Sequence, residues 1–266
     1  MIYKVKKYYP AGIDRRKLLE EGYAKGRSIG TNAEEYKNQD FWPLLASHVR
    51  KDRTYLDAGC GVGGWLLFLN EEGYRVEGVD EAAKVLRSMT EYNRDLRVKQ
   101  GRLTALPYAD NSFDGVLAIG SLDHEEDDLD AAVKEMRRVL KHDGLLFLEV
   151  PLLNSLRRWK YVPLKRLEAL VRRALGHREV FAGYMFDRSA IKDLLKKHGF
   201  TVHEVKPHDL QKSGEHYGLY VDWKWLRGSR PYQLNFLGKI AKALWNAISP
   251  WVASTGMVVV ARKVKN

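Results

Sequence analysis

The most constraining feature of this sequence is the stretch 54–64, Thr-Tyr-Leu-Asp-Ala-Gly-Cys-Gly-Val-Gly-Gly. It begins with a short β-type run that includes Asp57, and it continues into closely spaced glycines that let the backbone turn sharply. The apolar run 65–69 that follows predicts a helix packed on a sheet. A strand, a glycine-rich turn and a helix N-terminus together form a place where a nucleotide-like cofactor can bind.

Strands and helices alternate regularly on both sides of this turn. Gly73 stands where a helix C-terminus favours glycine, and the next strand ends in Asp80. Such alternation implies parallel βαβ units with right-handed crossovers, and therefore an α/β fold with a doubly wound sheet. The predicted elements are strand 54–57, helix 62–72, strand 74–79, helix 81–93, strand 97–100, loop 101–111, strand 113–119, helix 131–140 closed by Gly144, and strand 145–150, which stops at Pro151.

The segments outside this core differ from it in pattern. Helices are predicted over 14–22 and 32–50, where Asn32 and Glu35 have capping-box spacing. Leucines at helical spacing over 164–175, among many Arg and Lys residues, predict a basic amphipathic helix. The rest is predicted as a helix from Asp187 to His198, a strand over 200–205, an irregular aromatic segment over 207–254 and a terminal strand over 255–264.

The charge of the chain is unevenly distributed. The formal net charge is +11, but residues 1–151 carry 23 Lys and Arg against 26 Asp and Glu, whereas residues 152–266 carry 22 against 8. This asymmetry favours an anionic substrate, a nucleic acid or a membrane surface near the second half, although a merely solvated basic surface is an equal alternative. With one cysteine, no spanning apolar run and no secretory signal, we expect a cytoplasmic protein without intrachain disulfides.

Two carboxylates distinguish among possible cofactors. The spacing G-x-G-x-x-G at 59–64 is a weak signal alone. Asp80 follows Gly61 by 19 residues, at the end of the second strand, where a carboxylate can accept hydrogen bonds from both ribose hydroxyls of an adenosine; capping the next helix is the alternative. Asp57 would repel a pyrophosphate, but it suits a cofactor that carries an ammonium and a sulfonium.

The segment 55–63, Tyr-Leu-Asp-Ala-Gly-Cys-Gly-Val-Gly, resembles the first motif of class I S-adenosylmethionine-dependent methyltransferases. The resemblance continues through Val79-Asp80, through 106–114 and 122–124, through 135–144 and into the closing elements at 184–200 and 257–263. It implies a single domain over 1–266 with a seven-stranded, mostly parallel sheet of order 3-2-1-4-5-7-6, its last strand antiparallel and helices on both faces. The implied parts are an N-terminal helical cap (1–50), a cofactor-binding core (51–151), acceptor-side insertions (152–186 and 207–254) and closing elements (187–206 and 255–264).

The resemblance also implies the cofactor, S-adenosyl-L-methionine, and the residues around it. The glycines would surround the methionine part, Asp57 would orient the turn or the amino group, and Asp80 would hold the ribose. Arg102 departs from the family, which commonly has an acid there that accepts a bond from the adenine amino group; arginine only donates. The implied cofactor-binding residues are Asp57, Gly59, Cys60, Gly61, Gly63, Asp80, Glu81, Arg102, Leu103 and Ile119.

Transfer of a methyl group to a hydroxyl is helped by a base, and the pKa of histidine suits that role. His124, after the fourth core strand, is the candidate base, with Asp123 or Asp127 as its neighbour; a purely structural role is equally weighted. No metal is expected. Methylation of a nucleic acid base is disfavoured, because the sequence after that strand lacks the Asn/Asp-Pro-Pro-aromatic signature of exocyclic amine methylation.

The main hypothesis is therefore an O-methyltransferase whose acceptor is small or lipid-linked, with an anionic group as an option. An RNA-associated methyltransferase, or a non-catalytic protein of the same fold that binds RNA through 157–178, is the first alternative, and an NAD(P)-dependent oxidoreductase is the second. The amphipathic segment 235–251 could contact a membrane peripherally, or pack under the sheet or against a second copy. The sequence does not indicate an oligomeric state.

Overall fold

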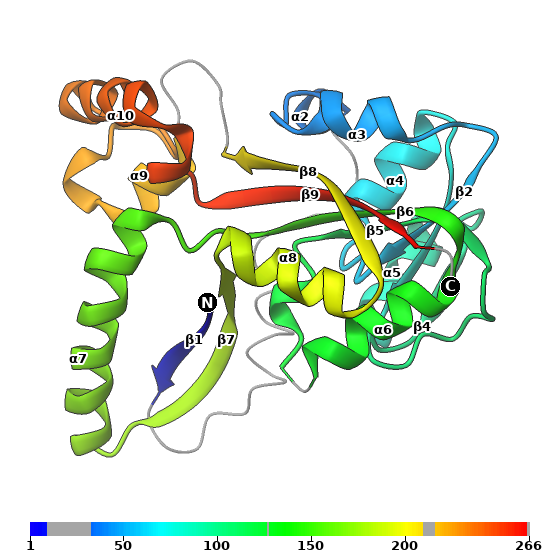
Figure 1. Cartoon of the computed structure of the whole chain (residues 1–266), viewed down its shortest axis with the longest axis horizontal. Helices are drawn as coiled ribbons and strands as arrows, with labels where there is room; N and C mark the ends of the chain where they lie inside the picture. Colours follow the sequence, from blue (N-terminus) through cyan, green and yellow to red (C-terminus); the bar gives the residue numbers. More distant parts are fainter. Residues whose placement is uncertain (10–32, 127, 210–215, 265–266) are drawn as a thin grey trace.

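The computed structural model describes residues 1–9, 33–126, 128–209 and 216–264. Its main feature is a seven-stranded sheet of order β4-β3-β2-β5-β6-β9-β8 (Figure 1). Numbered by their order along the chain, these strands run 3-2-1-4-5-7-6, and β9 is antiparallel to both of its neighbours, so the predicted fold class is confirmed. The strands are β2 (Thr54–Ala58), β3 (Arg75–Asp80), β4 (Val98–Gln100), β5 (Phe113–Ile119), β6 (Leu140–Pro151), β8 (Phe200–His208) and β9 (Gly256–Lys263).

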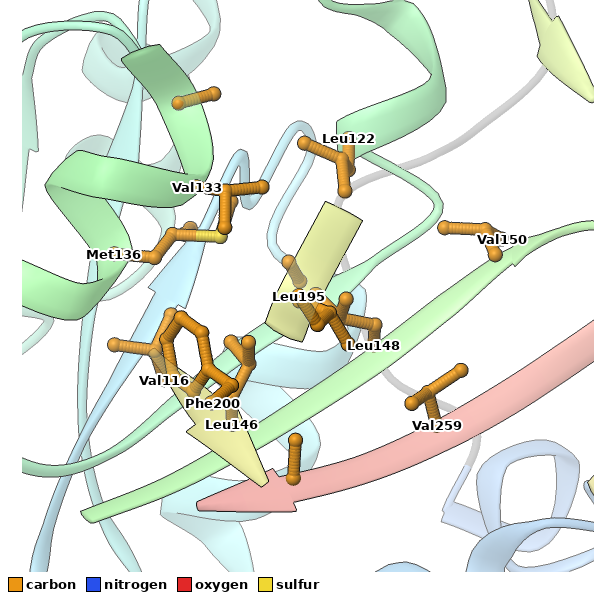
Figure 2. Packing of buried hydrophobic residues seen from close by; sticks show 14 of the residues in the cluster. Val116, Leu122, Val133, Met136, Leu146, Leu148, Val150, Leu195, Phe200 and Val259 are labelled. Atoms are coloured by element: carbon orange, nitrogen blue, oxygen red, sulfur yellow. The ribbon is translucent and has the colours of Figure 1, made fainter. Parts of the chain in front are cut away.

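Helices cover both faces of this sheet. On one face lie α2 (Ala33–Lys37), α3 (Trp42–His48), α4 (Gly64–Glu71) and α5 (Ala83–Tyr92), whose apolar side chains share a core cluster with Tyr55 and Phe147. On the other face lie α6 (Leu129–Val139) and α8 (Arg188–Lys197). Figure 2 shows Val133, Met136 and Leu195 from these two helices meeting strand residues such as Leu146. Because both faces are covered, the central strands are apolar almost throughout.

The ends of the core helices follow local sequence signals. Gly73 after α4 and Gly199 after α8 have left-handed backbone angles, with φ of 87° and 69°, as C-terminal glycines commonly do. Asp187 begins α8 by accepting a hydrogen bond from the backbone N–H of Ala190. Gly144, by contrast, does not close α6. That helix ends at Val139, and Gly144 lies within β6, where the pairing with β5 is irregular.

The N-terminal segment differs from the predicted helical cap over 1–50. Residues Ile2–Tyr9 form a strand, β1, which pairs antiparallel with β7 (Arg178–Phe186) in a separate two-stranded sheet. The aromatic and β-branched residues of β1 explain this outcome. The predicted helix 32–50 is present as the two short helices α2 and α3. The predicted helix 14–22 and the cap residue Asn32 lie outside the described residues.

The insertions contain more helix than the sequence suggested. The basic amphipathic helix is present as η2 (Arg157–Tyr161) followed by α7 (Val162–Ala174). The segment predicted as irregular includes the helices α9 (Tyr217–Asp222), η3 (Lys224–Leu226), α10 (Phe236–Ile248) and η4 (Pro250–Val252). Leu219, Leu226, Leu234 and Ala253 form a small core of their own under these helices.

Two leucines on helices test this description of the core. Leu195 of α8 is fully buried, so Leu195→Ala should lower the free energy of unfolding by about 2–5 kcal/mol. Leu167 of α7 is 59% exposed, so Leu167→Ala should change it by less than about 0.5 kcal/mol. Urea unfolding followed by circular dichroism measures both values. Equal losses in the two variants would contradict this assignment of core and surface.

Candidate functional site

The strand order reverses between β2 and β5, and their carboxyl ends meet there. The hydroxyl of Ser121, just after β5, donates a hydrogen bond of 2.6 Å to the carbonyl oxygen of Ala58 at the end of β2. A Cβ added to Gly59 would lie 2.4 Å from the Cβ of Ser121, so only glycine fits against this contact. Ligands of doubly wound sheets bind in the crevice at this reversal.

The glycine-rich turn after β2 takes the backbone into conformations that favour glycine. Gly59, Gly61 and Gly63 have φ of 80°, 52° and 79°, and α4 begins at the next residue. The backbone N–H groups of Gly59 and Cys60 both donate to the carbonyl oxygen of Val79, at 2.8 and 3.0 Å. The predicted strand, turn and helix are therefore present, while contact between these glycines and a cofactor stays a prediction.

Asp80, at the end of β3, holds the turn in place. One of its carboxylate oxygens accepts from the backbone N–H of Gly61, at 2.9 Å, and the other accepts from that of Ala82, also at 2.9 Å. The second bond lies just before α5, whose N-cap is Ala82, so the alternative that Asp80 itself caps this helix is wrong. A carboxylate accepts about four hydrogen bonds, so these two leave capacity for ribose hydroxyls.

Asp57 lies buried on β2 beside this turn. Burial, and then the negative charge of Asp80, raise the pKa of Asp57 to about 7. Two carboxylates held close together in a buried site favour a ligand with a positive charge, because that charge would stabilise both ionised forms. The donor set therefore fits a cofactor that carries an ammonium group.

The remaining residues predicted near a cofactor lie around this crevice. Arg102 and Glu81 are largely exposed at the β3–β4 edge, with 3.9 Å between the Arg102 Nε and a Glu81 carboxylate oxygen. Leu103 is partly buried against the core, and Ile119 ends β5. The thiol of Cys60 lies in a core cluster, and burial raises its pKa well above the usual value, so it has the packing role that its size suggests.

His124 lies in a short helical turn after β5, η1 (Leu122–His124). Its side chain is 63% exposed, and its Nε2 lies 3.6 Å from a carboxylate oxygen of Asp123. Asp123 is itself buried, which raises the pKa of its carboxyl, and its Oδ1 has no hydrogen-bond partner within the described ranges. Asp127, the other proposed neighbour, lies outside them. His124 thus sits at the predicted edge of the sheet but mostly in solvent.

A second group of titratable side chains lies at the same edge, and the sequence did not indicate it. Glu149 of β6 pairs with Ile119 of β5, and its carboxylate lies 3.9 Å from the Nε2 of His208. The Nδ1 of His208 contacts the carboxylate of Asp40, which joins α2 to α3. Asp40 also accepts from the backbone N–H of Asp209, at 2.8 Å. Glu149, His208 and Asp40 therefore form one connected cluster.

The environment of this cluster sets its charge. Burial raises the pKa of Glu149 to about 7, although His208 opposes this shift. Burial disfavours a charged His208, but its hydrogen bond with Asp40 and the nearby carboxylate of Glu149 outweigh this effect and raise its pKa. The ring of Phe41 packs edge-on against His208, with 4.7 Å between the ring centres. A Cβ on Gly256 would lie 2.7 Å from the His208 ring and 2.9 Å from Glu149, so glycine leaves room for both.

Comparisons with known proteins agree with this geometry. Residues 56–148 match the family model of a methyltransferase domain. An uncharacterized protein of Methanocaldococcus jannaschii is 27% identical over 175 residues, which cover 60% of this chain and 66% of that protein. A demethylmenaquinone methyltransferase of Staphylococcus aureus is 35% identical over 104 residues, which cover 37% of this chain and 43% of that enzyme. The chain thus spans between 43% and 66% of the length of these curated relatives.

The fold has solved counterparts as well. An S-adenosylmethionine-dependent methyltransferase from Methanosarcina mazei matches 85% of this chain and 100% of its own, with a TM-score of 0.59 and 19% identity. At that identity the likeness concerns the fold. Together with the match of residues 56–148 to a methyltransferase domain, it indicates the fold and the domain of S-adenosylmethionine-dependent methyltransferases, for which the implied cofactor is S-adenosyl-L-methionine.

Proposed function

We propose that this protein transfers the methyl group of S-adenosylmethionine to a hydroxyl of a small or lipid-linked acceptor. The choice of a hydroxyl acceptor rests on Glu149, whose carboxylate lies at the sheet edge beside the cofactor crevice. A hydroxyl gives up its proton during methyl transfer, and a base with a pKa near neutrality assists that step most.

The residues around the crevice suit the cofactor in distinct ways. The backbone of Gly59, Gly61 and Gly63 would surround its methionine part, and Asp57 would face the ammonium. The free acceptor capacity of Asp80 would take the ribose hydroxyls, with Leu103 beside the adenine. When bound, the cofactor supplies an electrophilic methyl group; the chain's task is to orient the acceptor and to exclude water.

Glu149 has the better position for a base. In the sheet, Asp57 pairs with Leu117 of β5, and Ile119 of the same strand pairs with Glu149. Asp57 and Glu149 thus point to the same face, with their backbones about 12 Å apart from two strand spacings across β5 and a two-residue offset along it. His208 and Asp40 hold Glu149 from the far side, and they offer a route by which its proton can leave. His124 remains the alternative base, with its ring more open to solvent.

The acceptor itself is part of the proposal. The demethylmenaquinone methyltransferase relative gives one acceptor to test, and the basic second half of the chain favours acceptors with an anionic group. A screen would follow transfer of labelled methyl groups from S-adenosylmethionine to phenols, hydroxy acids, hydroxylated isoprenoid lipids and the reduced, dihydroxy form of demethylmenaquinone. Transfer only to amines, to ring carbon or to RNA would reject a hydroxyl acceptor.

The pKa of Asp57 makes cofactor affinity depend on pH. Below pH 7 this carboxyl is neutral in the free protein, so it attracts an ammonium less. The dissociation constant for S-adenosylmethionine, measured by isothermal titration calorimetry, should rise about tenfold from pH 7.5 to pH 6. In Asp57→Asn, binding at pH 7.5 should be weaker and this pH dependence should largely vanish. An unchanged slope in Asp57→Asn would assign the dependence to another group.

The two candidate bases make opposite predictions for turnover. With an acceptor found in the screen, Glu149→Gln should reduce kcat by about 10²-fold or more while cofactor affinity stays within about twofold. His124→Ala should retain most of the activity. The wild-type rate should rise with pH through about 7, as Glu149 ionises. The reverse pattern, an active Glu149→Gln and an inactive His124→Ala, would move the base to His124.

A further inference from the structure

The amphipathic helix α7 turns its apolar side away from the protein. Its large apolar residues lie 52–66% exposed, at spacings that place them along one side of the helix. The opposite side carries Ala169, Lys165 and Arg173, which line a groove against β1; Leu170, at the edge of the apolar side, lines this groove as well. The exposed apolar residues are Leu164, Leu167, Leu170, Val171 and, just after the helix, Leu175.

Helix α10 also turns its large apolar side chains away from the protein. Its buried side consists of Gly238, with Ala241 and Trp245 packed against the small core under it. Its large apolar residues lie on the other side, 43–76% exposed, so the sequence alternative that this helix packs under the sheet is wrong for most of its apolar side chains. These residues are Phe236, Leu237, Ile240, Leu244 and Ile248. Monomeric proteins seldom leave apolar helix faces open in this way.

Cations accompany both apolar faces. The groove between β1 and α7 has a volume of about 310 Å³, and its lining includes five cations, Lys4, Lys6, Lys165, Arg166 and Arg173. Two of them, Lys6 and Arg173, pair with Glu179 of β7. On α7 the only acid is Glu168, which is engaged by Lys165 at 2.6 Å and Arg172 at 3.9 Å. Lys239 is exposed on α10, which carries no acid. Trp159 and Trp225, near the two helices in sequence, are 79% and 60% exposed.

We propose that α7 and α10 form a docking surface for an anionic lipid membrane, named here the lipid-facing surface. Apolar faces with flanking Lys and Arg, and with exposed tryptophans beside them, have the chemistry of helices that lie in a membrane interface. The positive charge favours an anionic membrane over a second copy of the chain, because two copies would bring the same cations close to one another. No described helix is long and apolar enough to span a bilayer, so contact would be peripheral.

The lipid-facing surface is tied to the acceptor side of the catalytic domain. Figure 1 shows α7 and α10 at one end of the molecule, away from α4, α5 and α6 at the other end. Arg157, at the start of η2, binds Asp222 of α9 through two of its nitrogens and also donates to the carbonyl oxygen of Leu152 just beyond β6. This buried link joins both helical insertions to the strand that carries Glu149. The proposal goes beyond methyl transfer and does not depend on it.

Vesicle sedimentation with the full chain tests the surface. The wild type should sediment with vesicles of phosphatidylcholine containing 30% phosphatidylglycerol, and far less with phosphatidylcholine alone. Added salt should weaken this binding. The double variants Leu167→Ser/Val171→Ser on α7 and Ile240→Ser/Leu244→Ser on α10 should each lower the partition coefficient about tenfold or more. Tyr92, the last residue of α5, is 56% exposed and lies outside this surface. Tyr92→Ser is therefore the matched control and should bind vesicles as the wild type does.

Three results would overturn the proposal. The first is a wild type that stays in the supernatant with anionic vesicles, and the second is double variants that sediment normally. The third is a dimer without vesicles that the serine variants convert to monomers, which would assign the apolar faces to a second copy. Light scattering measures the oligomeric state, and circular dichroism checks that the variants are folded. Asp57→Asn should still sediment, so failed vesicle binding and failed cofactor binding are distinguishable.

Discussion

The hydrogen bond from the backbone N–H of Gly61 to Asp80 is the interaction on which the site most depends. It ties the glycine turn after β2 to the end of the neighbouring strand β3, at 2.9 Å. The N–H groups of Gly59 and Cys60 complete this attachment through the carbonyl of Val79. The turn can then approach a ligand with its backbone, and α4 can begin at once behind it. Glycine is required because three residues of the turn have positive φ.

The same arrangement has an electrostatic cost that a cofactor relieves. Burial first, and then the negative charge of Asp80, raise the pKa of Asp57, so the free protein disfavours the ionised form of this carboxyl. A bound ammonium would favour the ionised pair. Farther along the same edge, Glu149 is also buried, but there a histidine and a second carboxylate accompany it. Two acidic positions on one sheet face thus have different partners, which suits one to a cationic cofactor and the other to proton transfer.

The parts of the fold that the sequence could predict are those fixed by local pattern. The strands β2 to β6 and the helices between them follow from apolar runs, from glycines such as Gly73 and from acids at strand ends. The parts that it could not predict depend on distant partners. Strand β1 forms because β7 pairs with it, and the paired residues are 169 to 184 residues apart along the chain. His208 and Asp40 meet across 168 residues, so no spacing could indicate the cluster around Glu149. The exposure of His124 likewise depends on packing.

For the two amphipathic helices, the local sequence pattern predicts a helix but not which way its apolar side faces. Leucine spacing correctly indicates the helix α7, yet the same spacing suits a helix whose apolar side faces a core. The neighbouring strand explains the direction. The groove between β1 and α7 is lined by Lys4, Lys6 and tyrosines of β1 and by Lys165, Arg166 and Arg173 of α7, so this side of the helix is mainly cationic. The apolar arc is then left outside. β6 continues through residues 152–156 and η2 into α7, and Arg157 donates back to the carbonyl oxygen of Leu152. A surface that binds α7 would therefore also restrain the strand end that carries Glu149. Membrane contact and proton transfer would then involve one connected part of the fold.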